Sequence, residues 1–137
     1  MENYKFIKDL TSDIMFEAYG NSMEEVFENS ARALFDVICQ RDSIKGEKIV
    51  ELSCEGENPE DLMINWLQTL IASVDIDGMF YNDFKVKEIT DKKVVADCFG
   101  EEVTAEKGET VVKAVTYYNY LFEKTDDGYK TRVVVDI

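Results

Sequence analysis

The sequence predicts an α+β fold in which two amphipathic helices pack on a largely antiparallel (mixed) β-sheet. Two segments, one after Ser22 and one after Asn58, repeat apolar residues at helical spacing. From Met79 onward, apolar and polar residues alternate as they do in strands. A chain of 137 residues is long enough to bury its own core, so we expect a single domain over residues 1–137.

The first predicted elements are two short strands joined by a turn. Residues 4–8 are typical of a strand, and residues 9–12 favour a turn because Asp, Thr and Ser side chains bond to nearby backbone. One face of the next strand then carries Ile14, Phe16 and Ala18. Gly20 and Asn21 end this strand.

The first helix begins after Ser22, which we expect to be its N-cap. Glu25 lies three residues on, and the pair forms a capping-box pattern. The helix buries a stripe made of Met23, Val26, Phe27, Ser30, Ala31, Leu34, Val37 and Ile38. Residues 42–46 are predicted to be a loop, and residues 48–54 a strand.

The second helix has equally clear boundaries. Asn58 caps it, Pro59 occupies its first turn, and Glu60 and Asp61 lie where the helix dipole is positive. Its apolar stripe consists of Leu62, Met63, Trp66, Leu67, Leu70, Ile71 and Val74. A stripe of this kind is more often core than a cofactor site.

Four strands follow, at residues 79–89, 93–100, 110–123 and 129–136. The segment Thr125–Gly128 predicts a tight hairpin between the last two strands, because Asp-Gly tolerates positive φ. One face of the strand at residues 110–123 should carry Val112, Ala114, Tyr118, Tyr120 and Phe122. One face of the strand at residues 129–136, extended to the last residue, should carry Tyr129, Thr131, Val133, Val135 and Ile137. For Tyr117, Tyr118 and Tyr120 we favour sheet packing over base stacking.

The amino-acid composition limits the classes of molecule that this protein is expected to bind. The 29 acidic and 15 basic residues give a net charge of −14, which opposes strong direct binding of nucleic acid and favours a basic partner protein or a cation. Acidity that only confers solubility is the competing interpretation. No apolar run approaches the ~18 residues of a membrane span, and no secretion signal is evident. Three cysteines without a CxxC pattern favour reduced, mostly buried thiols in the cytoplasm.

The sequence contains no histidine. This excludes Ser-His-Asp and Cys-His catalysis and the usual zinc sites. A metal bound by this chain should therefore have oxygen ligands, which is the preference of Ca²⁺ and Mg²⁺.

Carboxylates at the two ends of the chain form the candidate metal site. Asp9 and Asp13 bracket the first turn, Asp136 is the penultimate residue, and the carboxylate of Ile137 adds an oxygen if the native chain ends there. These oxygens would converge if the last strand lies beside the first turn, and a cation would neutralise their repulsion. On the residues alone, the simpler interpretation ranks higher: Asp9 is a turn residue and Asp136 a solvated strand end.

The same regions resemble a known family, the archeases. The family's N-terminal pattern of two aspartates, a short apolar strand, Gly, Ser/Thr and a Glu pair is matched by Asp9, Thr11, Asp13, Ala18-Tyr19-Gly20, Ser22 and Glu24-Glu25. Further matches are Ala33 to Val37, Leu62, Trp66-Leu67, Gly100-Glu101, Lys113 to Tyr117 and Asp136-Ile137. Leu10 and Tyr118 stand where the family has histidine, and a histidine that usually follows the Gly-Glu pair is also absent.

This resemblance implies a non-enzymatic protein that activates a GTP-dependent tRNA-splicing RNA ligase. Such proteins promote guanylylation of the ligase and let it turn over repeatedly in tRNA splicing or RNA repair. The resemblance also implies a divalent cation, Ca²⁺ with Mg²⁺ as the alternative, held by Asp13, Asp136 and the Ile137 carboxylate. Asp9 and Lys113 are weaker functional candidates.

Two other functional classes stay open on the sequence. One is a chaperone-like module that changes the oligomeric state of a partner protein and needs no metal. The other, which is less favoured, is a metal-dependent phosphoesterase built on the same carboxylates.

Overall fold

The structure is a computed structural model that describes residues 3–7 and 13–137. Each predicted helix and strand is present, with two added 3₁₀ turns, η1 (Arg41–Ser43) and η2 (Ala105–Lys107). In chain order the strands and helices are β1 (Tyr4–Ile7), β2 (Ile14–Gly20), α1 (Met23–Ile38), β3 (Lys48–Glu55), α2 (Pro59–Ile76), β4 (Met79–Ile89), β5 (Lys93–Glu102), β6 (Ala114–Thr125) and β7 (Gly128–Asp136).

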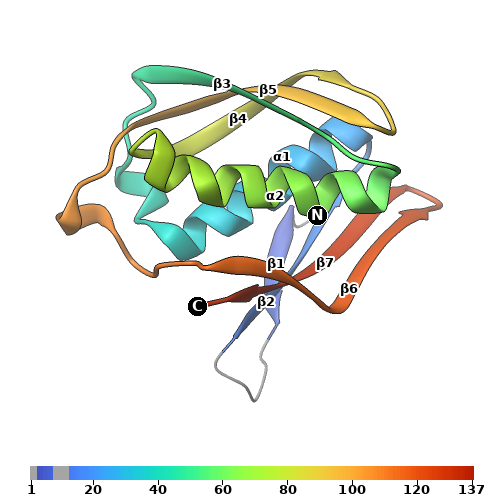
Figure 1. Ribbon diagram of the computed structural model, residues 1–137. Coiled ribbons are helices and arrows are strands. Elements are labelled where there is room, and N and C mark those ends of the chain that lie inside the picture. Colours follow the sequence, from blue (N-terminus) through green and yellow to red (C-terminus); the bar gives the residue numbers. More distant parts are fainter. Residues whose placement is uncertain (1–2, 8–12) are drawn as a thin grey trace.

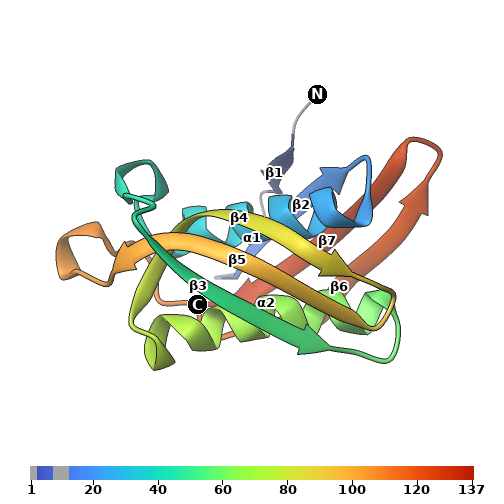
Figure 2. The ribbon, with the colours of Figure 1, turned by 90° about the horizontal axis from the view of Figure 1, so that it is seen from above.

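The strands form two sheets rather than one. The first has the order β1-β2-β7-β6 and the second the order β3-β5-β4, and all strand pairs among the described residues are antiparallel. Both helices lie in a layer between the sheets, as Figures 1 and 2 show from two directions. The predicted α+β class is therefore confirmed, but the strands that were expected to form one sheet divide into two, one on each side of the helices.

The helices can face two sheets because their apolar surfaces are broad. Helix α1 packs on β2 and β4, and α2 packs on β3 and β6. Large side chains fill the layer between them, and the fully buried set includes Phe16, Phe27, Phe35, Trp66, Tyr81 and Phe84. The Trp66 indole N–H donates to the Phe27 carbonyl at 3.1 Å, which joins the two helices and satisfies a buried donor.

Both predicted N-caps are confirmed. The Ser22 hydroxyl accepts from the Glu25 N–H at 3.2 Å, and the Asn58 side chain accepts from the Asp61 N–H at 2.8 Å. Among the hydrogen bonds of the described residues, Ser22 and Glu25 form only this half of the capping box.

Strand β6 departs from its predicted pattern. It begins at Ala114 instead of residue 110, and its register against β7 shifts between Thr116 and Leu121. Asn119 adopts a φ of 53° inside this irregularity. As a result Tyr117 and Tyr118 are 69% and 63% exposed, so the prediction that they pack in the sheet is wrong. The single face predicted for this strand is broken at the same place.

The other parts of β6 and β7 behave as predicted. Tyr120 packs against the core, and its hydroxyl donates to the Glu60 carbonyl at 2.7 Å. Thr131, Val133 and Val135 are fully buried on β7. The tight hairpin is confirmed by the pairing of Thr125 with Gly128. Neither helix in the described part of the chain has the length and apolar character needed to cross a membrane.

Candidate functional site

The pairing of β2 with β7 brings the two chain ends together. Ile14 pairs with Val135 in this antiparallel ladder. Asp13 comes just before Ile14, and Asp136 comes just after Val135, so both aspartates lie at the same end of the strand pair. Figure 1 shows the end of β7 beside the start of β2. Both side chains are half-buried.

Lys113 reaches the same end from the other side of β7. Ala114 pairs with Asp136, and the Lys113 N–H donates to the Asp136 carbonyl at 2.8 Å. Ile137 follows and packs partly against the core. The structure therefore gathers Asp13, Asp136, Ile137 and Lys113 in one region, whereas Asp9 and Leu10 lie outside the described residues.

The donor chemistry of this region suits a hard cation, because its anionic ligands are carboxylate oxygens. Within residues 3–7 and 13–137, no group of three or more His, Cys, Asp or Glu side chains converges on one point. Asp13, Asp136 and the Ile137 carboxylate would thus need further main-chain or water oxygens to complete a Ca²⁺ site, which takes 6–8 oxygen ligands. The metal ligands named from the sequence stay a prediction.

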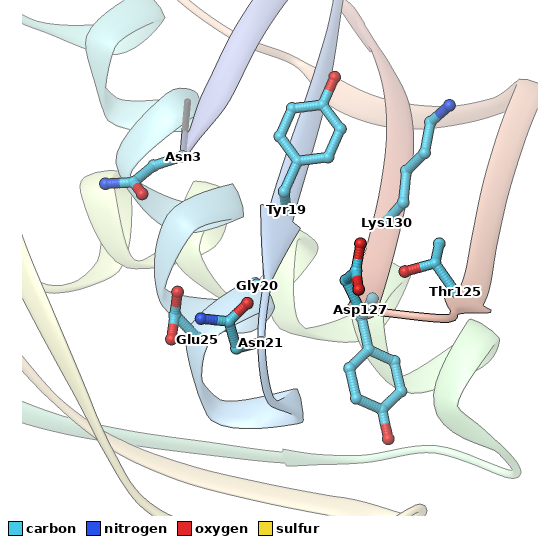
Figure 3. Close-up of a pocket in the computed structure, with 9 residues that line it drawn as sticks. Asn3, Tyr19, Gly20, Asn21, Glu25, Thr125, Asp127 and Lys130 are labelled. Carbon is cyan, nitrogen blue, oxygen red and sulfur yellow. The ribbon is translucent and has the colours of Figure 1, made fainter. Parts of the chain in front are cut away.

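The opposite end of the same strand pair carries a pocket of about 300 Å³ (Figure 3). It lies where Gly20 faces Tyr129, between the end of β2 and the β6–β7 hairpin. Its lining consists of Asn3, Tyr19, Gly20, Asn21, Glu25, Thr125, Asp127, Tyr129 and Lys130. Sequence reasoning did not identify this pocket; the two turns that border it were predicted, but not that they meet.

Glu17 forms ion pairs with three basic side chains. It is only 5% exposed, on the face of the first sheet that points away from the helices. It accepts hydrogen bonds from the Tyr19 hydroxyl at 2.8 Å and from Arg132 Nε at 2.9 Å. Lys130 and Lys5 approach it at 3.6 and 3.9 Å.

These neighbours keep Glu17 ionised. Burial alone would raise the pKa of Glu17, but the hydrogen bonds from Tyr19 and Arg132 and the charge of Lys130 outweigh it and hold the pKa below its usual value. Nothing in the local sequence distinguished Glu17, because its partner Arg132 is 115 positions away.

The cysteines show no sign of thiol chemistry. Cys39 and Cys98 are buried, Cys54 is half-buried, and all three are free thiols. Burial raises the pKa of Cys39 and of Cys98 to about 12 and that of Cys54 to about 11. A thiolate is the reactive form, so these side chains are suited to packing rather than to nucleophilic catalysis.

Comparison with known proteins agrees with this arrangement. The model of the archease protein family matches residues 4–137. The chain belongs to the archease family. A protein archease from Methanosarcina acetivorans is 38% identical over 142 residues, which cover 99% of this chain and 97% of that protein.

Solved structures support the archease fold as well. The solution structure of protein 1598 from Methanobacterium thermoautotrophicum has a TM-score of 0.84 and 31% identity, and the match covers 100% of both chains. A crystal structure of an archease from Thermotoga maritima, named a possible chaperone, has a TM-score of 0.69 and 26% identity, with 96% of this chain and 95% of that chain covered.

Proposed function

We propose that this archease-family protein is a non-enzymatic activator of a GTP-dependent RNA ligase in the cytoplasm. In this role it promotes guanylylation of the ligase and multiple turnover in tRNA splicing or RNA repair. One observation carries the proposal: β2 and β7 place two aspartates of the family motifs, Asp13 and Asp136, at one end of the same strand pair, with Lys113 beside them.

Asp13, Asp136 and the carboxylate of Ile137 would hold the divalent cation, Ca²⁺ in preference to Mg²⁺. A bound cation would offset the repulsion between these carboxylates. The fold of the chain positions these ligands. Antiparallel pairing holds the two aspartates on neighbouring strands, and the Lys113 main chain anchors Asp136.

The charge of the molecule supports a protein partner. A net charge of −14 favours encounter with a basic protein face and opposes direct contact with RNA phosphates. We therefore propose that the ligase, rather than the RNA, is what this protein binds.

The test is multiple-turnover ligation by a cognate ligase with GTP and RNA that carries 2′,3′-cyclic phosphate and 5′-hydroxyl ends. Wild-type protein should raise the number of turnovers, and Asp13→Asn should reduce that stimulation at least about tenfold because a cation ligand is lost. Asp126→Asn is the matched control, since Asp126 is exposed in the β6–β7 hairpin at the other end of the strand pair. Failure of the wild-type protein to stimulate the ligase would refute the proposal.

A chaperone-like role is the second candidate, and the name of the Thermotoga maritima relative favours it. In that case this protein would change the oligomeric state of its partner without a cation. Size-exclusion chromatography of the ligase with and without this protein, in the presence of a chelator, separates the two. A shift that persists with the chelator supports the chaperone-like role.

A further inference from the structure

An apolar groove lies between the C-terminal half of α2 and the segment that joins β5 to β6. It encloses about 300 Å³. Most of its lining is apolar: Ile38, Ile71, Val74, Phe80, Val103, Ala105, Val111 and Val112. Its volume is enough for one or two large aliphatic side chains. We call this feature the α2 groove.

The α2 groove has exposed apolar residues along its edges. Val111 is 81% exposed and Val103 is 42% exposed. Ile76, which is 80% exposed, follows Asp75, a residue of the groove lining. Exposed aliphatic residues grouped around a concave apolar surface are typical of a site that another molecule covers.

The charge around the α2 groove is negative. Asp75 and Glu109 line it, and no Lys or Arg of the described chain does. The nearby Lys107 is engaged elsewhere, since its ammonium contacts Glu101 at 2.6 Å and the Ser43 carbonyl at 2.9 Å.

The end of α2 adds to this negative potential. A helix C-terminus carries a partial negative charge that cations stabilise. The last turn of α2 has no basic residue, and its C-cap is another acid, Asp77. The groove therefore offers apolar contacts beside a helix end whose negative charge the chain itself leaves uncompensated.

We infer that the α2 groove binds a basic, amphipathic segment of a partner protein, with an aliphatic side chain in the groove and lysines or arginines against Asp75, Glu109 and the end of α2. A second copy of this chain fits poorly, because it would bring a net charge of −14 and the same acidic rim against this one. The same repulsion between negative charges disfavours binding of anionic membranes and nucleic acids.

The α2 groove is close to the candidate functional site along the chain. Val111 and Val112 line it, and the next residue, Lys113, contacts Asp136. A segment bound in the groove would thus lie toward the end of the molecule that carries Asp13 and Asp136. Binding of such a segment in the groove requires neither a ligase nor a cation.

Fluorescence anisotropy with a labelled helical peptide tests this inference. The probe has about twelve residues, with leucines at i and i+4 spacing and lysines elsewhere. A second peptide replaces the leucines by serines and keeps the charge, and a third replaces the lysines by glutamates and keeps the leucines. Only the first should bind with appreciable affinity.

Variants of the protein locate the binding. Val111→Ser should weaken binding of the first peptide about tenfold, the equivalent of one buried valine side chain. Val111 is mostly exposed, so the change leaves the core intact. Ile49→Ser is the matched control: Ile49 is 61% exposed on β3 outside the groove, and its substitution should leave the affinity unchanged.

Amide chemical shifts of the ¹⁵N-labelled protein provide a second readout. Addition of the first peptide should move the signals of Val103, Val111 and Val112. Three results would each overturn the inference: equal binding of the serine peptide, equal effects of Val111→Ser and Ile49→Ser, or shift changes confined to another surface. Because neither ligase nor GTP is present, such a failure leaves the proposed function standing.

Discussion

At the scale of single residues, Glu17 shows how tertiary contacts change the chemistry of an ordinary side chain. Its carboxylate lies between Arg132 and Lys130 of β7 on one side and Lys5 of β1 on the other. A buried charge costs free energy unless it is paired and hydrogen-bonded, and Glu17 is both. It therefore links three adjacent strands of the first sheet through one ionised group.

Glu17→Gln should lower the free energy of unfolding by about 1–3 kcal/mol at neutral pH, because the charge-assisted hydrogen bonds are weakened while their donors stay in place. Urea unfolding followed by circular dichroism measures this. Glu88→Gln, at an exposed position of β4, is the control and should change stability little.

The same residue predicts a pH dependence. The folded-state pKa of Glu17 lies below the ordinary value of 4.5, so as the pH falls the unfolded chain takes up the proton first. The stabilisation from Glu17 is complete above that ordinary value and is lost as the pH drops through the lower, folded pKa. In a titration from neutral pH to about pH 3, the free energy of unfolding of the wild type should fall by more than that of Glu17→Gln. Parallel curves for the two proteins would contradict this assignment.

At the scale of elements, strand β5 depends on Gly100. Gly100 faces Tyr81 of β4, and a Cβ atom added to it would lie 1.9 Å from the Phe80 carbonyl oxygen. The obstacle is backbone, which cannot move aside as a flexible side chain would. The two strands approach this closely only because position 100 has no side chain.

Gly100→Ala should therefore destabilise the protein by about 1–3 kcal/mol, the usual cost of overpacking. Gly108→Ala is the matched control, because the nearest atom to its Cβ would be Cζ of the Phe80 ring at 3.5 Å, an ordinary van der Waals contact. Thermal unfolding of the two variants gives the comparison. Equal melting temperatures would show that β4 and β5 separate without cost.

At the scale of the whole molecule, acidity is the dominant property. The chain carries 29 acidic and 15 basic residues, and like charges on a compact surface repel one another. Several ion pairs offset part of this repulsion, including Lys48–Glu102 and Arg32–Asp83. The Lys48–Glu102 pair is exposed and the Arg32–Asp83 pair partly exposed, and surface pairs of this kind each contribute little to stability.

Salt should consequently stabilise the protein. Raising NaCl from about 0.02 M to about 0.5 M shortens the screening length severalfold and should raise the melting temperature by a few degrees. The measurement is made with a chelator present, so that a divalent cation at Asp13 and Asp136 does not contribute. A melting temperature that falls with salt would mean that the ion pairs outweigh the net repulsion.

The sequence alone was sufficient to predict the helices and strands, because their signals are local. The caps at Ser22 and Asn58, the proline at position 59 and the hairpin before Gly128 each act within a few residues. The archease resemblance also came from the sequence, and the family match over residues 4–137 confirms it. The sequence predicted that Asp13 and Asp136 come together if the last strand lies beside the first turn. The β2–β7 register brings both aspartates to the same end of that strand pair, whereas residues 9–12 of the turn lie outside the described residues.

Only the tertiary structure decided the features that depend on distant contacts. Periodicity marks which face of an element is buried but not what covers it, so it did not show that the strands divide into two sheets around the helices. The displaced Tyr117 and Tyr118 arise from the register of β6 against β7. The burial of Glu17 and the α2 groove likewise join segments that are far apart in the chain. These features follow from packing between elements, which local residue patterns do not encode.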